Sequence, residues 1–337
     1  MHSINVLRLP HLALIEVLKC WNPFELFTFA QCSEKAARVI PLAGTKNFYL
    51  SCHSYAFIAI NQYVFNIAKI RQHRGYQRRN IDCAVETKQY QNWCTSFWKN
   101  EWTGFRKICL YLSDLFQCPV ARYCHTNDVT MSQFFQFAQE IVRKRNEIKI
   151  LSFDFSKYGR KFSNGTYNAC LRTLSRLNVT EELHVVFRSV DFMNPINLAV
   201  VPKCVHLRYA PWFTRKHLLS FENCTLVRLH ETKLTNKDID EFVNLWRLGG
   251  FSELQAMEVS SENLRHDVSI GGIKKLRDCS NRIRRIKTIT GYTFHVPEGV
   301  VIQRNDGKKA DMRLGPCFSH FFTFIAHSEE DILEPVS

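Results

Sequence analysis

The sequence predicts an α+β protein built from three parts. Residues 1–44 predict a small helical unit, residues 45–125 an aromatic, β-containing connecting region, and residues 126–337 a repeat-like α/β domain. Three observations predict this fold: helical spacing of apolar residues near the N-terminus, short β-favouring runs in the middle, and a recurring apolar pattern separated by helix signals afterwards. The 337 residues are enough for two or three domains and a sizeable core.

The first part carries the signals of three short helices. A proline follows Leu9 where a helix can begin, and apolar residues continue at helical spacing. Asn22 and Pro23 predict the start of a second helix, and Ser33 offers an N-cap for a third. The second helix is apolar on nearly every side, through Phe24, Leu26, Phe27 and Phe29. A unit of about 40 residues is barely stable alone, so we expect the rest of the chain or another protein to cover this surface.

The middle part is rich in aromatic residues and cysteine. Its β-favouring runs lie at residues 47–52, 55–60 and 107–112. For Trp93, Trp98 and Trp102 we favour core packing over a platform for stacked bases. The 13 cysteines form no C-x-x-C pair, which predicts reduced, buried thiols in a cytoplasmic or nuclear protein and makes a zinc site improbable.

A weak internal repeat follows in the third part. The pattern apolar-x-x-apolar-x starts at Ile148, Cys204, Leu226 and Leu254, with a looser copy at Leu183. Most of the steps between copies are in or near the range of a leucine-rich repeat, in which each unit supplies one strand and a returning helix. Apolar stripes after Thr130 and after the Thr235 capping box predict such helices. The alternative is an ordinary α/β domain whose strands are evenly spaced.

Composition and motifs argue against most enzyme classes. With 13 glycines the chain has no Gly-rich phosphate loop and no nucleophile elbow. His230 and Glu231 begin a zinc-protease motif, but Leu234 occupies the second histidine position. No nucleophile, base and orienting residue can be named together. We therefore expect no enzyme activity and no cofactor.

The net charge of +14 predicts attraction to acidic partners. The basic residues cluster at residues 71–79, 143–145 and 274–287, and we favour solvated faces over a nucleic-acid footprint for them because no aromatic-interleaved motif accompanies them. No apolar run reaches the roughly 18 residues of a membrane span, and no signal peptide is apparent, so no membrane partner is expected.

Two segments carry a family resemblance. Residues 7–40, LRLPHLALIEVLKCWNPFELFTFAQCSEKAARVI, resemble an F-box, and residues 197–259, ending in LTNKDIDEFVNLWRLGGFSELQAMEV, resemble the F-box-associated type 2 domain of a large nematode family. The resemblance implies a three-helix F-box at the N-terminus and a C-terminal domain that captures a target, in the part of the chain that the repeat predicts to be leucine-rich-repeat-like. It further implies a non-catalytic substrate receptor of a Skp-cullin-F-box ubiquitin ligase, with a Skp-family adaptor and, through it, cullin as partners. The alternative is a basic nucleic-acid-binding protein.

The resemblance also implies which residues face the adaptor. They are Leu9, Pro10, Val17, Leu18, Pro23, Leu26, Phe29 and Cys32. The bulky loop of residues 21–24 departs from the F-box pattern and has two expected locations, against the adaptor or against the following domain.

The repeat predicts a second site on the sheet. If strands at 204–210, 226–232 and 254–260 are parallel and in register, His206 lies beside Arg228 and Ala256, and Arg208 lies beside His230 and Glu258. We therefore predict a basic strip on the exposed sheet face, formed by His206, Arg208, Arg228 and His230, that receives an acidic or phosphorylated target. The alternative is a merely solvated sheet face.

Overall fold

The computed structural model divides the chain into two compact units, Met1–Lys149 and Ile150–Ser337. It describes residues 6–54, 57–69, 83–90, 92–125, 129–154, 164–186, 198–265, 268–273, 282–287, 293–297, 299–315, 320–327 and 333–335. The basic cluster at 71–79 and the first part of the cluster at 274–287 lie outside these residues. Helices and strands occur in both units, which confirms the predicted α+β class.

The N-terminal helices of unit 1 begin where the cap residues predict. They are α1 (His11–Lys19), α2 (Pro23–Ala30) and α3 (Glu34–Val39). The Asn22 side chain accepts hydrogen bonds from the backbone N–H groups of Phe24 and Glu25, at 2.9 and 3.0 Å. The Ser33 hydroxyl accepts one from Ala36 N at 3.1 Å. Because such bonds are local, they could be read from sequence.

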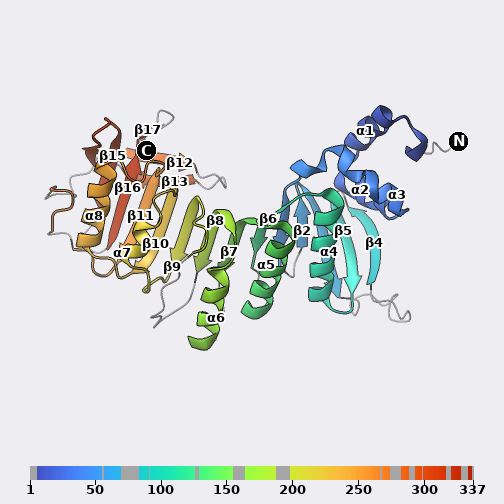
Figure 1. Cartoon of the computed structure of the whole chain (residues 1–337), viewed down its shortest axis with the longest axis horizontal. Helices are drawn as coiled ribbons and strands as arrows, with labels where there is room; N and C mark the ends of the chain where they lie inside the picture. Colours follow the sequence, from blue (N-terminus) through green and yellow to red (C-terminus); the bar gives the residue numbers. More distant parts are fainter. Residues whose placement is uncertain are drawn as a thin grey trace. The chain divides into compact units, whose positions relative to one another are not determined.

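A mixed sheet follows in unit 1, with strand order β6-β1-β2-β3-β5-β4. Its strands are β1 (Leu50–His53), β2 (Phe57–Ile60), β3 (Tyr63–Lys69), β4 (Cys83–Tyr90), β5 (Trp93–Trp98) and β6 (Val120–Cys124). Helices α4 (Glu101–Phe116) and α5 (Met131–Arg145) pack on one side of it, as Figure 1 shows.

The strand prediction at 107–112 is wrong, because these residues lie inside α4. The Asn100 side chain caps this helix by accepting a hydrogen bond from Thr103 N at 2.9 Å, and the apolar side chains recur at helical spacing so that one face is buried.

The prediction that the tryptophans pack in the core holds in part. Trp98 is buried, whereas Trp93 is 53% exposed.

The apolar surface of α2 is covered by the chain itself. The rings of Phe24 and Phe27 pack edge-to-face on Phe65 of β3, with centroids 4.9 and 5.3 Å apart, and Phe27 also meets Tyr111 of α4. The helical unit therefore shares one core with the sheet that follows.

Helix α5 belongs to unit 1, and the predicted domain boundary at 125/126 stays a prediction. The structure divides at 149/150, because α5 belongs to the core of unit 1. Its Phe134 stacks on Tyr123 of β6 at 4.3 Å, and its Glu140 pairs with Arg106 of α4.

Unit 2 contains a broad sheet with strand order β7-β8-β9-β10-β11-β16-β15-β14. Its first elements are β7 (Ile148–Asp154), α6 (Asn164–Leu174), β8 (Val179–Val186), β9 (Cys204–Arg208), α7 (Arg215–Leu219), β10 (Leu226–Thr232), α8 (Asn236–Arg247) and β11 (Ala256–Ser261). Strands β8 to β11 are parallel. The sheet ends in the antiparallel strands β16 (Phe321–Ala326), β15 (Lys309–Leu314) and β14 (Val300–Gln303). A separate small sheet holds β12 (Arg282–Lys287), β13 (Thr293–Pro297) and β17 (Leu333–Pro335).

Helices α6, α7 and α8 lie on one side of this sheet (Figure 1). The predicted capping box of α8 is present, and its apolar stripe, Ile239, Phe242, Val243 and Trp246, is fully buried. The Trp246 and Phe324 rings meet at 5.0 Å between centroids. Strands therefore alternate with helices as expected, a feature that the leucine-rich-repeat prediction and its alternative share, so the leucine-rich-repeat likeness stays a prediction.

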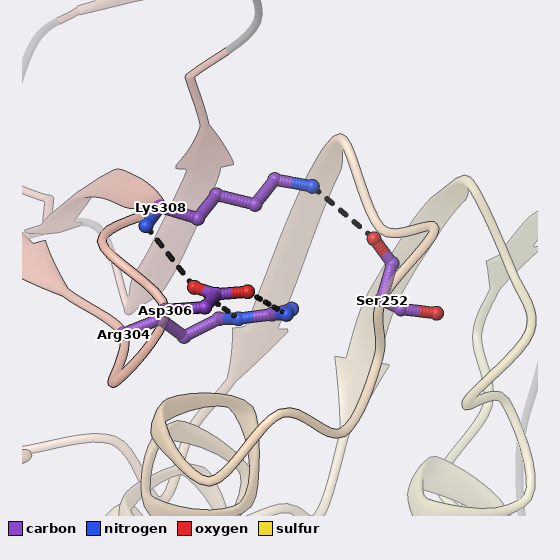
Figure 2. Close-up of polar contacts among 4 residues, drawn as sticks. All are labelled: Ser252, Arg304, Asp306 and Lys308. Carbon is purple, nitrogen blue, oxygen red and sulfur yellow. Dashed lines mark hydrogen bonds and ion pairs between the residues drawn. The ribbon is translucent and has the colours of Figure 1, made fainter.

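The turn between β14 and β15 is tied to the segment that follows α8. Figure 2 shows the Asp306 carboxylate accepting hydrogen bonds from the Arg304 guanidinium and from Lys308 N. The Lys308 ammonium donates to the Ser252 carbonyl oxygen at 3.1 Å. These bonds hold the outer hairpin against the end of the α8 layer.

Candidate functional site

The side of the unit 2 sheet opposite its helices carries a continuous line of polar side chains. The strand register places His206 beside Arg228 and Arg208 beside His230, as the sequence predicts. The third strand differs from the prediction, because Ala256 lies beside Leu226, and Glu258 lies beside Arg228. Residue 254 ends a turn before β11, and the Thr225 carbonyl accepts from the N–H groups of residues 255 and 256, which sets this register.

We call this line the polar row. From β8 to β15 the paired register gives His184, His206, Arg228, Glu258, Thr323 and Arg313 in adjacent strands. Ser152 of β7 extends it through a 3.2 Å contact between its Oγ and His184 Nδ1. All seven side chains are half-buried. A spacing of about 4.8 Å between strands makes such a row contiguous across the sheet.

The histidines of the polar row are held in the neutral form. The rings of His184 and His206 stack at 4.3 Å. Burial, reinforced by His184 and Arg228, lowers the pKa of His206 to about 2. Burial also lowers the pKa of His184 and of the adjacent His230. At neutral pH these rings therefore provide hydrogen-bonding groups without charge.

Glu258 neutralises part of the predicted basic strip. Its carboxylate accepts from Arg228 Nε at 3.1 Å and lies 3.4 Å from His230 Nε2. The Arg228, His230 and Glu258 side chains are 29, 20 and 22% exposed. Three of the four residues that the sequence predicts as an exposed basic strip, His206, Arg228 and His230, are half-buried. The register of β11 changes the partner of Glu258, which lies beside Arg228 and not beside Arg208 as predicted.

Arg208 remains the exposed cation of the strip. Its guanidinium lies over the Tyr209 ring at 5.5 Å from the centroid, and within the described part of the chain it forms no ion pair. Tyr209 and Glu231, which follow the paired Arg208 and His230, both have positive φ, 59° and 56°. Such backbone is uncommon for these residue types. The positive φ of Tyr209 and Glu231 ends the regular pairing of β9 with β10 and changes the direction of the side chains at this point.

A hollow lies beside the polar row. Its floor belongs to the buried cluster of Cys204, Leu226, Ala256 and Ile325, and Arg228, Glu258 and Thr323 also line it. The space in it is small, about 10 Å³, which is room for about one water molecule. Among the described residues, no group of three or more His, Cys, Asp or Glu side chains could hold a metal ion.

Sequence reasoning missed most of the row. Ser152, His184, Thr323 and Arg313 were not named as site residues, and Glu258 was placed beside the wrong strand position. His184 follows the first apolar position of the looser repeat copy, and His206 stands near the same point of its own copy, so aligning the copies could have found it.

The predicted adaptor-facing residues have three environments. Leu18, Pro23 and Leu26 are buried, Leu9, Val17 and Phe29 are half-buried, and Pro10 and Cys32 are exposed. Sequence reasoning also missed Leu12 of α1, which is 77% exposed. Apart from Leu12, the three-helix unit therefore offers a mostly half-buried apolar surface, and whether an adaptor uses it stays a prediction.

Fold and site together define an α+β protein of two compact units, in which the larger sheet of unit 2 carries a half-buried row of polar side chains. Comparison with known proteins agrees in part. The model of a family described as "F-box associated" matches residues 198–259, which confirms the predicted C-terminal domain and covers β9, β10 and most of β11. "Skn-1 dependent zygotic transcript 15 protein" of Caenorhabditis elegans is 25% identical over 350 residues, 92% of this chain and 94% of that protein. No solved structure matches.

No helix in the described parts of the chain is both long and apolar enough to span a bilayer.

Proposed function

We propose that this protein is the substrate-recognition subunit of a Skp-cullin-F-box ubiquitin ligase. The observation that carries the proposal is the F-box associated match at 198–259, on the strands that form the centre of the polar row. Three short helices precede it in the chain, at His11–Lys19, Pro23–Ala30 and Glu34–Val39, in the order that the resemblance implies.

The N-terminal helices supply the adaptor contact in this proposal. Leu12 is the most exposed large apolar side chain of the described residues. Half-buried Val17 and Phe29 and exposed Pro10 and Cys32 belong to the same unit. An apolar surface of this kind on a small helical unit is suited to a partner's groove or helix.

The sheet of unit 2 supplies the target contact. Arg208 is exposed and forms no ion pair among the described residues, although Glu231 lies within electrostatic range of it. His206, Arg228 and His230 lie next to it. An acidic or phosphorylated target segment is the occupant that such a cation favours.

The receptor itself breaks and forms no bond in this proposal. It holds adaptor and target on one chain, so that a target lysine meets the charged ubiquitin-conjugating enzyme at a high effective concentration. The residues that matter are therefore binding residues on two surfaces.

Copurification of the full-length chain with a recombinant Skp-family adaptor tests the proposal. Leu12→Asp is expected to abolish copurification, because it places a charge in the docking surface. Leu248→Asp is the matched control, since Leu248 is 74% exposed and lies in unit 2. Far-UV circular dichroism checks that both variants fold.

Two outcomes contradict the proposal. The first is a folded wild-type protein that copurifies with none of the Skp-family adaptors tested. The second is equal copurification of Leu12→Asp and Leu248→Asp. Steeply salt-dependent binding to heparin or RNA, with no adaptor bound, would instead favour the nucleic-acid alternative.

A further inference from the structure

The two faces of the unit 1 sheet differ in how well they are covered. Helices α4 and α5 lie on one face (Figure 1), where Cys52 and Tyr123 are fully buried. Side chains at alternate positions along a strand point to the other face. On that face Trp93 is 53% exposed and Tyr49, next to the start of β1, is 40% exposed. Two large aromatic side chains therefore reach solvent on the face away from α4 and α5.

One line of residues crosses this face from β6 to β5, and we call it the crossing row. The strand register places its members in adjacent strands: Arg122, Ser51, Ala59, Val64 and Trp93. The three residues in the middle have short side chains. Four strand spacings of about 4.8 Å separate the two ends by about 19 Å. The crossing row therefore has a cation at one end, an indole at the other and low side chains between them.

The cation end of the crossing row carries further rings. Arg122 Nε donates a hydrogen bond to the Tyr49 hydroxyl oxygen at 3.3 Å, so the phenol ring lies beside the guanidinium. The rings of His53 and Phe57, which are paired neighbours on β1 and β2, stack at 4.4 Å along one border of the row. Burial and the charge of Arg122 lower the pKa of His53, so this imidazole is neutral at pH 7 and adds a flat uncharged ring.

Flat rings together with a cation favour an occupant that has planar groups and negative charge. Bases stack on exposed aromatic side chains, and phosphates pair with arginine. An acidic peptide would supply the charge but no planar rings, and a duplex keeps its bases stacked on one another. The net charge of +14 attracts a polyanion to the molecule.

We propose that this face of unit 1 binds single-stranded nucleic acid, with one base stacked on Trp93, another on Tyr49 and a phosphate at Arg122. The inference is separate from the proposed function, because these three residues lie outside both the N-terminal helices and unit 2. It gives the exposed Trp93 a binding role in place of the core packing that the sequence favours.

The length of the crossing row sets the length of the bound segment. At about 3.4 Å per stacked nucleotide, 19 Å corresponds to about six nucleotides. Fluorescence anisotropy of the full-length protein with labelled oligouridylate and oligothymidylate of three, six and twelve nucleotides tests this length. We expect an affinity at least tenfold higher for six nucleotides than for three, with a smaller gain from six to twelve. A preference for uridylate identifies RNA, and a preference for thymidylate identifies DNA.

Variants of Trp93 test the stacking. Trp93→Ala is expected to weaken binding of the twelve-nucleotide strand at least fivefold, whereas Trp93→Phe keeps a ring and should recover most of the affinity. Tyr111→Ala is the matched control, because Tyr111 is 38% exposed and belongs to α4, on the other side of the sheet. Circular dichroism checks that the variants fold.

Variants of Arg122 test the phosphate contact. Arg122→Gln should reduce the slope of log affinity against log salt concentration by about 0.7, the contribution of one single-strand phosphate. Arg122→Lys keeps the charge and should keep the slope. Arg143→Gln is the control, because Arg143 is an exposed residue of α5.

Three outcomes overturn the inference. Equal affinity for a twelve-base-pair duplex and for the single strand would show attraction by charge alone. Unchanged affinity in Trp93→Ala would exclude stacking on Trp93. Self-association of the wild-type protein in analytical ultracentrifugation that Trp93→Ala removes would assign the face to a second copy of the chain. Adaptor copurification of Trp93→Ala is read separately and should equal that of the wild type, so the failure of one proposal is distinguishable from the failure of the other.

Discussion

The imidazole rings of His184 and His206 stack face to face, with centroids 4.3 Å apart and planes inclined by 9°. The two residues are direct neighbours on the parallel strands β8 and β9, and the strand spacing of about 4.8 Å brings such rings into contact. Arg228 stands on the other side of His206. A protonated imidazole in this position would be partly desolvated beside a guanidinium, so the fold favours the neutral ring.

The first prediction concerns stability at low pH. Burial, His184 and Arg228 hold the pKa of His206 near 2, against an ordinary value of 6.5. Because the folded pKa lies below the unfolded one, the contribution to stability is complete above pH 6.5 and is lost as the pH falls from 6.5 towards 2. We expect His206 to lower the free energy of unfolding by about 1 kcal/mol between pH 7 and pH 5.5, measured by urea denaturation.

The variant His206→Asn provides the control for this prediction. It keeps a polar side chain that cannot titrate, so the slope of stability against pH should become shallower. The lowered pKa values of His184, His230, His217 and His53 leave part of the slope in place. An unchanged slope in the variant would show that His206 is not held in the neutral form.

The second prediction concerns Glu258. Its carboxylate accepts from Arg228 Nε and approaches His230, so Glu258→Gln should leave Arg228 without its anionic partner and make the sheet face more basic. We expect later elution from a heparin column and a change in stability of at most about 1 kcal/mol, since the pair is partly exposed. Glu262→Gln removes the same charge at an exposed position, and equal elution of the two variants would argue against a special role for Glu258.

The third prediction separates packing from docking in the N-terminal helices. Leu26 is 0% exposed, so Leu26→Ala should destabilise unit 1 by about 2–5 kcal/mol through lost burial and a cavity. Leu12→Ala, at an exposed position, should change stability by less than about 0.5 kcal/mol. Urea unfolding followed by tryptophan fluorescence compares the two variants, and similar costs would mean that Leu12 is not a free surface residue.

The fourth prediction concerns Gly104 of α4. A Cβ at this position would lie 2.3 Å from Trp98 Cγ, so the helix and β5 meet closely only because the residue is glycine. Gly104→Ala should destabilise the unit by about 1–3 kcal/mol, although alanine is the better helix former. Thr103→Ala, on the exposed side of the same helix, should be neutral or stabilising. Differential scanning calorimetry of both variants tests this prediction, and a gain in stability in both would contradict the close contact between Gly104 and Trp98.

Helix starts were predictable because their causes are local. Asn22, Ser33, Thr130 and Thr235 stand at the N-caps of α2, α3, α5 and α8, and a cap needs only its own side chain and the next turn of backbone. Residues 107–112 predict a strand wrongly, because a short apolar run fits a strand and a helix equally well. The cap at Asn100 and the burial of one face by the sheet decide for the helix.

Only the neighbours that follow from the repeat spacing could be predicted for the candidate site. Counting along the chain placed His206 beside Arg228, since both lie two residues after the first position of their repeat copy. It misplaced Glu258, because the turn before β11 displaces the strand by two residues relative to the repeat. Loop length and turn bonds are not encoded in the apolar period, so register across a crossover cannot be read from it.

By itself the sequence determined the α+β class, the helix caps, the F-box associated segment and the set of basic residues near the strand ends. The tertiary structure alone decided which of those residues are covered and what faces them: Leu18 and Leu26 became core, Leu12 became surface, and Arg228 acquired Glu258 as its partner. The physical reason is the distance along the chain over which each interaction acts. Capping and periodicity act over one or two turns of chain, whereas burial, ion pairing and the pKa of a histidine depend on neighbours that only the packed sheet brings together.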